Sequence, residues 1–168
     1  MNTAVSEEAD RWVDAGRRAL WSGTLASVFS TGLLAWLGQT RLRKPFAPTN
    51  ATSHWLWGDK ESFSSLEPSL RHTAVGYATH HASALMWALF YERWLARKRE
   101  RTLGRIVTGA ALTALIAAFV DYQLTPKRLT PGFEAHLSRV SMVGVFAAIG
   151  VGLAAGALLR SAGERSRS

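Results

Sequence analysis

Residues 71–92 read RHTAVGYATHHASALMWALFYE, and this stretch decides how the rest of the chain is interpreted. A mainly apolar stretch of about 20 residues is long enough to cross a bilayer as one helix. His80 and His81 lie well inside it, where ionisable side chains are costly and are usually tied to a function. The stretch therefore predicts a membrane-spanning helix that carries a polar site.

Three more stretches have the length and composition of membrane spans. Residues 19–38 and 140–159 each hold 20 residues without a charge. Residues 106–120 are also uncharged but short for a crossing, so we expect this helix to continue to Leu124, just before the break at Pro126. The fold class predicted is all-α, a four-helix membrane bundle in a single domain, residues 1–168. Its spans are expected at about 19–38, 73–95, 104–124 and 137–159, followed by a disordered tail at 160–168.

The two ends of the chain and its connections carry local signals. Ser6 is a candidate N-cap for a short amphipathic helix over residues 6–18, but the better interpretation of these residues is a solvated lead-in to the first span. The longest connection, residues 39–72, holds Trp55 and Trp57, which suit an interfacial helix that Asn50 caps and Gly58 ends. After Pro126, the pair at residues 130–131, threonine then proline, is typical of the start of the last helix.

Composition narrows the class of protein. The 168 residues carry a net charge of +8, and mean hydropathy is close to zero because apolar and charged residues stand in separate blocks. The basic residues flank the apolar stretches, which favours contact with a lipid bilayer and no binding of nucleic acid. The absence of cysteine excludes disulfides, thiolate metal sites and cysteine catalysis. Acidic residues precede the first span, which does not match a signal peptide, so that span is expected to remain as a membrane helix.

Charge also predicts an orientation. Four spans put both termini on one side, where 12 of the 20 basic residues fall; the other 8 fall on the opposite side, including a cluster at residues 41–44. The positive-inside rule then places the termini in the cytoplasm.

Small residues recur every fourth position on three of the spans, and such faces allow helices to approach closely. The residues expected to pack in this way are Gly23, Ser27, Gly76, Ala84, Gly144, Ala148, Gly152 and Gly156. The last span has the most extended face, which could dock a partner helix or a second copy in a homo-oligomer. His80 shares the small face of its own helix, whereas His81 is turned from it by about 100°.

The topology gathers ionisable residues on the side opposite the termini. All five histidines are there, and the candidate polar site comprises His54, His72, His80, His81, Asp121, Tyr122, His136 and Arg139. Its centre is expected at His80, His81 and Asp121.

Several interpretations of this polar layer stay open. In a purely structural one, Asp121 pairs with Arg128 or Arg139 and His80 donates to a backbone carbonyl. In a second, His80 and Asp121 form a site for protons or a small solute, because histidine titrates near neutral pH. A third is a metal, haem or quinone site, for which ligands are present but no known ligand spacing is. A fourth is an assembly subunit; an enzyme is the least supported, since no nucleophile motif occurs.

Three stretches together resemble a known family: residues 50–58 (NATSHWLWG), residues 71–92, and residues 121–134 (DYQLTPKRLTPGFE). They are similar to small, uncharacterised four-span inner-membrane proteins of bacteria, and the likeness covers most of the chain from Ala19 to Leu159. The resemblance implies a topology and a bacterial inner-membrane location, and no chemistry. A shorter likeness at Thr79 and His80, to inner-membrane proteins linked to acid tolerance, favours the proton interpretation.

Overall fold

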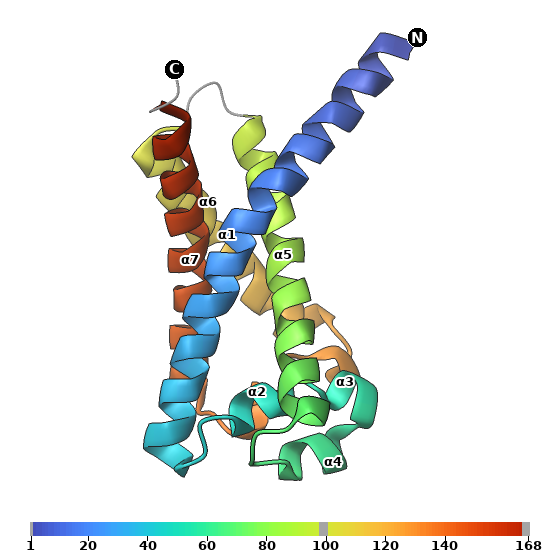
Figure 1. Cartoon of the computed structure of the whole chain (residues 1–168), viewed down its shortest axis with the longest axis vertical. Coiled ribbons are helices and arrows are strands. Elements are labelled where there is room, and N and C mark those ends of the chain that lie inside the picture. Colours follow the sequence, from blue (N-terminus) through green and yellow to red (C-terminus); the bar gives the residue numbers. More distant parts are fainter. Residues whose placement is uncertain (1, 98–100, 166–168) are drawn as a thin grey trace.

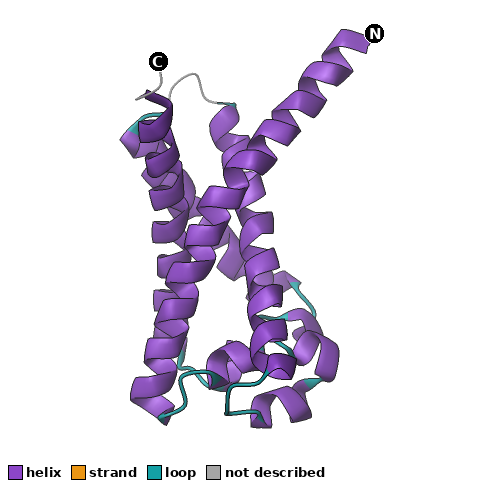
Figure 2. Ribbon diagram, viewed as in Figure 1, coloured by secondary structure: helices purple, strands orange, loops and turns teal. Residues whose placement is uncertain are grey.

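The computed structural model describes residues 2–97 and 101–165, and every element in them is helical, which confirms the all-helical prediction (Figure 2). The long helices are α1 (Asn2–Leu42), α5 (Val75–Ala96), α6 (Leu103–Phe119) and α7 (Arg139–Arg165). One π-helical turn, η1 (Leu70–Ala74), precedes α5, and another, η2 (Val120–Leu124), continues α6. Shorter elements are α2 (Ala47–Ala51), α3 (His54–Trp57), α4 (Asp59–Ser64), η3 (Lys127–Leu129) and η4 (Phe133–Ala135).

The long helices pack along one another. α1 lies against both α5 and α7, and α6 lies against α7 and α5. The N-terminus and the end of α7 lie at the same end of the molecule, while α2, α3 and α4 cluster at the opposite end (Figure 1). We call residues 43–69, which contain these three short helices, the cap. The cap end and the termini end are therefore distinct, as the predicted topology requires.

Three helices are long and apolar enough to cross a membrane: Val5–Leu42, Leu103–Leu124 and Arg139–Gly163. The fourth predicted span, α5, does not meet the same measure. Its 22 residues include two histidines in the first half and the adjacent pair Glu92 and Arg93 near the end, all of which lower its hydropathy. Length and composition alone thus support a membrane protein with three apolar helices.

α1 is packed against α7 at a distance that only small residues permit. A Cβ built at Gly152 would lie 2.4 Å from the Cα of Ala26, and one built at Gly156 would lie 2.4 Å from the Cα of Ser22. Both atoms are backbone and cannot move aside, so a larger residue would push the helices apart. Gly152 and Gly156 of α7 therefore pack against α1 of the same chain. α1 thus covers the face that could otherwise have docked a partner helix.

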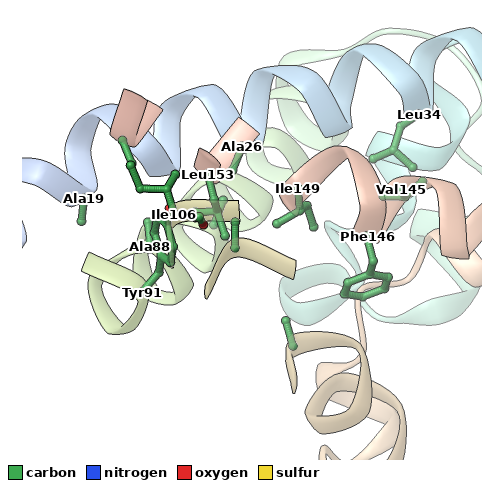
Figure 3. Packing of buried hydrophobic residues seen from close by; sticks show 14 of the residues in the cluster. Ala19, Ala26, Leu34, Ala88, Tyr91, Ile106, Val145, Phe146, Ile149 and Leu153 are labelled. Carbon is green, nitrogen blue, oxygen red and sulfur yellow. The ribbon is translucent and has the colours of Figure 1, made fainter. Parts of the chain in front are cut away.

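The other small residues pack in several ways. Gly23 brings α1 close to α5, with Leu85 Cα 2.9 Å from a built Cβ, whereas Gly76 lies against the carbonyl oxygen of Thr49 in the cap. Of the other small residues that were predicted to pack between helices, Ser27 and Ala84 are buried, and Gly144 and Ala148 are half-buried. Apolar side chains complete the core between the helices, with Ala26, Ile149 and Leu153 among them (Figure 3).

Several local predictions are corrected by the structure. α1 begins at Asn2 and has no break after residue 18, so Ser6 caps no separate helix; the pair Arg18–Asp14 at 3.0 Å stabilises the continuous helix. Asn50 lies within α2, and its side chain bonds to other loop residues instead of capping. Gly58, with a positive φ of 79°, does end α3 as predicted.

The connection before α7 also differs from the prediction. Thr130 starts no long helix, because Gly132 takes a left-handed conformation and only the short η4 follows. α7 begins at Arg139, and the Ser138 hydroxyl accepts a hydrogen bond from the Ser141 amide. The helix runs on to Arg165, past the expected end of the span; the last three residues of the predicted tail lie outside the described residues.

Candidate functional site

A cavity of about 180 Å³ lies at the cap end, lined by α5, α6 and α7 and roofed by the cap and by the loop after α6. His80 and Asp121 both line it, together with four aromatic side chains. The lining is formed by Thr52, Trp55, His80, Ser83, Ala84, Met86, Trp87, Ala117, Val120, Asp121, Thr125, Leu129, Pro131, Phe133, Phe146 and Ile149. At about 30 Å³ per molecule of liquid water, this volume holds about six waters or a small solute. We call it the His80 cavity.

His80 is buried on α5 and joined to α1 by a hydrogen bond. Its Nε2 lies 2.7 Å from the Ser30 hydroxyl, which lies 2.8 Å from the carbonyl oxygen of Ala26. A hydroxyl has one proton, so when Ser30 donates it to this carbonyl, His80 Nε2 donates to Ser30. Nδ1 then carries a free lone pair, and no hydrogen bond to it occurs within the described residues. His80 is therefore anchored by one nitrogen and open at the other.

Asp121 stands in the first turn of η2, half-buried, without a hydrogen bond or ion pair in the part of the chain that the structure describes. The expected pairing with Arg128 or Arg139 is not observed there. The neighbouring carboxylate, Glu134, accepts instead from the Tyr122 hydroxyl at 3.2 Å and from the Thr130 hydroxyl at 2.6 Å. Asp121 thus faces the His80 cavity with no cation to compensate it.

The remaining residues of the predicted site lie elsewhere. His81 stacks on Tyr77 with ring centroids 5.7 Å apart, and its buried Nδ1 has no partner among the described residues. His136 follows η4, and its Nε2 is likewise buried without a described partner; burial lowers the pKa of this histidine. Arg139 is exposed at the start of α7 and lines a separate groove.

His54 ties the cap to the loop after α6. Its Nδ1 lies 2.7 Å from Asp59 Oδ1, and its Nε2 lies 2.9 Å from the carbonyl oxygen of Thr130. Trp55 Nε1 donates to the same carbonyl at 2.8 Å. Because both partners of the His54 ring only accept hydrogen bonds, the ring satisfies both when each nitrogen carries a proton. The roof of the His80 cavity is held by these contacts.

His72 joins η1 to the cap. Its Nδ1 lies 3.1 Å from the Ser53 hydroxyl, and its Nε2 lies 3.4 Å from a Glu61 carboxylate oxygen. Neither His72 nor His54 is among the residues that line the cavity. These two histidines therefore serve the architecture of the cap, and His80 is the histidine that lines the cavity.

Sequence reasoning missed two sets of polar residues. Ser30 was not singled out, although it lies next to the small face of its span, because its bond to His80 depends on how two helices are apposed. At the termini end, buried Glu92 pairs with Arg101 at 3.1 Å, and buried Arg93 pairs with Glu8. The cue was present in the sequence, since adjacent opposite charges at the end of an apolar stretch need partners.

Within the described residues, no three His, Asp or Glu side chains come together in a group that could hold a metal ion. Comparisons of the chain with models of protein families, with curated proteins and with solved structures found no match. The function is therefore argued from the residues of the His80 cavity themselves.

Proposed function

We propose that this chain is a bacterial inner-membrane protein that crosses the bilayer four times and relays protons by binding them at His80 and Asp121. In this topology α5 is the second crossing along the chain, held by α1 on one side and by α6 on another. The termini face the cytoplasm and the cap lies outside, in agreement with the distribution of basic residues. The resemblance to small four-span proteins of bacteria supports the same arrangement.

The observation that carries the proposal is that His80 and Asp121 line the same cavity while neither has a charged partner within the described residues. Ionisable groups inside a membrane protein are usually paired unless they serve a pathway or a relay. The imidazole is the side chain whose ordinary pKa lies closest to neutral pH. A cavity that holds about six waters can connect the two groups by hydrogen bonds.

In chemical terms, a proton that enters from the cap side is taken up by His80 Nδ1 or by the Asp121 carboxylate. The bond from Nε2 to Ser30 keeps the ring in place as its charge changes, and also offers that charge a hydroxyl dipole. In the purely structural interpretation, the same bond between His80 and Ser30 only holds α1 and α5 together. The Ser30–His80 distance of 2.7 Å favours it equally, so the test must separate titration from this structural role.

The test uses purified protein in vesicles that enclose a pH-sensitive dye. We expect His80→Ala and Asp121→Asn to abolish proton uptake, and His80→Gln to abolish it as well while retaining a donor towards Ser30. The matched control is His81→Ala, which removes a neighbouring histidine that stacks on Tyr77 outside the cavity. Uptake that His80→Gln leaves unchanged would establish the purely structural interpretation and end the proton proposal.

A further inference from the structure

A second space runs between α6 and α7, separate in its chemistry from the His80 cavity. It measures about 620 Å³, in the range of small-molecule sites, and its lining is almost wholly apolar. We call it the α6–α7 groove. On α6 its lining runs from Val107 to Ala118, and on α7 it runs from Arg139 through Ala147 to Ala154.

Small residues make this groove deep. On α7 the lining follows a helical stripe, and at Gly150 a built Cβ would lie only 3.4 Å from the Cβ of Ala114 on α6. Both helices are among the three that are apolar enough to cross a membrane. An apolar groove on such helices is filled by hydrocarbon, because water gains no hydrogen bonds there.

One end of the groove is charged. Arg139 and Tyr122 lie there, at the cap end of the two helices. Arg139 has no acidic partner in the part of the chain that the structure describes. Glu134, a carboxylate in the loop before α7, already accepts hydrogen bonds from Tyr122 and Thr130. The Arg139 guanidinium is therefore available to bind an anion from outside the chain.

We propose that the α6–α7 groove is a binding site for an anionic phospholipid, with the headgroup phosphate on Arg139 and an acyl chain along the groove. A guanidinium binds phosphate through two parallel N–H···O bonds, and this geometry favours arginine over lysine. The α7 part of the lining, from Arg139 to Ala154, covers about 22 Å at 1.5 Å per residue. One leaflet contributes about 15 Å of hydrocarbon, so the groove is long enough for a full acyl chain.

This proposal rests on membrane insertion and not on the proton site. A lipid at Arg139 would stand beside Tyr122, whose sequence neighbour Asp121 faces the His80 cavity. Failure of one proposal leaves the other intact, because His80 and Asp121 line no part of the groove.

The experiment places the full-length protein in bilayers of equimolar phosphatidylglycerol and phosphatidylcholine, extracts it gently, and counts the retained lipids by native mass spectrometry. We expect wild type to retain phosphatidylglycerol selectively. Arg139→Gln should reduce this preference about fivefold, the factor that corresponds to about 1 kcal/mol for one arginine at an anionic surface. The control is Arg41→Gln, which removes an exposed charge at the same end of the molecule, outside the groove.

A second pair of variants tests the acyl chain. Ala147→Phe fills the groove and should lower the retention of both lipids, whereas Leu159→Phe, exposed on the same helix outside the groove, should not. Equal retention of the two lipids by wild type, or an equal loss in Arg41→Gln, would overturn the proposal. Since the chain has no cysteine, Ala147→Cys can also be crosslinked alone. Efficient disulfide formation between two copies at this position would instead identify the occupant as a second protomer.

Discussion

The two ends of the molecule hold their polar groups in different ways. At the cap end, buried side chains bond to backbone carbonyls and hydroxyls, as Asn50 and His54 do, and the acidic partners of its ion pairs, such as Glu61 and Glu67, are exposed. At the termini end, buried charges form pairs between segments, Glu92 with Arg101 and Arg93 with Glu8. Buried charges are thus paired at the termini end, whereas at the cap end the ion pairs reach the surface and the half-buried Asp121 has no ion pair within the described residues. The proton proposal places the function at the cap end because of this difference.

The largest effect that tests this contrast is expected at the termini end. Arg101→Gln removes the partner of Glu92, whose side chain is only 1% exposed, and leaves a buried carboxylate uncompensated. We expect a loss of about 3 kcal/mol in the free energy of unfolding, the lower range for breaking a buried pair. Thermal unfolding in detergent measures it.

The double variant Glu92→Gln with Arg101→Gln is the control for that prediction. Because it removes both charges together, it should recover most of the lost stability. If the single and double variants were equally unstable, the pair would not be what neutralises this end of the molecule.

A smaller effect is expected at the cap end. Asn50 is fully buried, donates to the carbonyl oxygens of Ser65 and Glu67 at 2.9 and 2.8 Å, and accepts from the Thr73 hydroxyl at 2.7 Å. Asn50→Ala leaves these three groups without their partner, which should cost about 2 kcal/mol after partial rehydration. Protease cleavage within the cap, compared with thermal unfolding of the whole chain, measures whether the loss is local.

The matched control for Asn50 is Ser64→Ala. The Ser64 hydroxyl bonds only to carbonyls of its own short helix, Lys60 and Glu61, and is exposed. It should therefore leave the cap unchanged. A cap that survives Asn50→Ala as well as it survives Ser64→Ala would mean that apolar contacts, not directional hydrogen bonds, order this end.

Local signals in the sequence were enough for part of this picture. The end of the third helix before Pro126 and the end of α3 at Gly58 follow from the backbone preferences of proline and glycine. The placement of His80 and Asp121 at one end of the molecule follows from counting spans. The all-helical fold follows from the apolar stretches themselves.

Contacts between distant residues could not be predicted. The bond of His80 to Ser30 joins residues 50 positions apart, and no local pattern encodes which hydroxyl a buried imidazole meets. The failure of Asp121 to pair with Arg128 or Arg139 has the same origin, since Glu134 and its donors are arranged by the fold of the whole loop. The continuity of α1 from Asn2 was not predicted, although the charged pairs in its first turns stabilise one another at i, i+4 spacing.

The smallest expected effect concerns pH at the cap end. Burial lowers the pKa of His136 below its ordinary value of 6.5, so the folded protein resists protonation that the unfolded chain accepts. Below that value the unfolded state binds more protons, and stability should fall as pH is lowered from about 7.5 to about 5.5. His136→Gln should flatten this part of the pH dependence of the melting temperature, because glutamine has no proton to gain.

Asp121 and other groups also titrate in acid, so the informative quantity is the difference between wild type and His136→Gln at each pH. The control is His81→Gln. It replaces another histidine at this end of the molecule, whose ring stacks on Tyr77 and makes no contact with His136 that the structure describes. Identical pH profiles for wild type and His136→Gln would show that this buried nitrogen is reached by water. The contrast between the two ends would then rest on the unpaired Asp121 and on the hydrogen bonds of Asn50, with no contribution from His136.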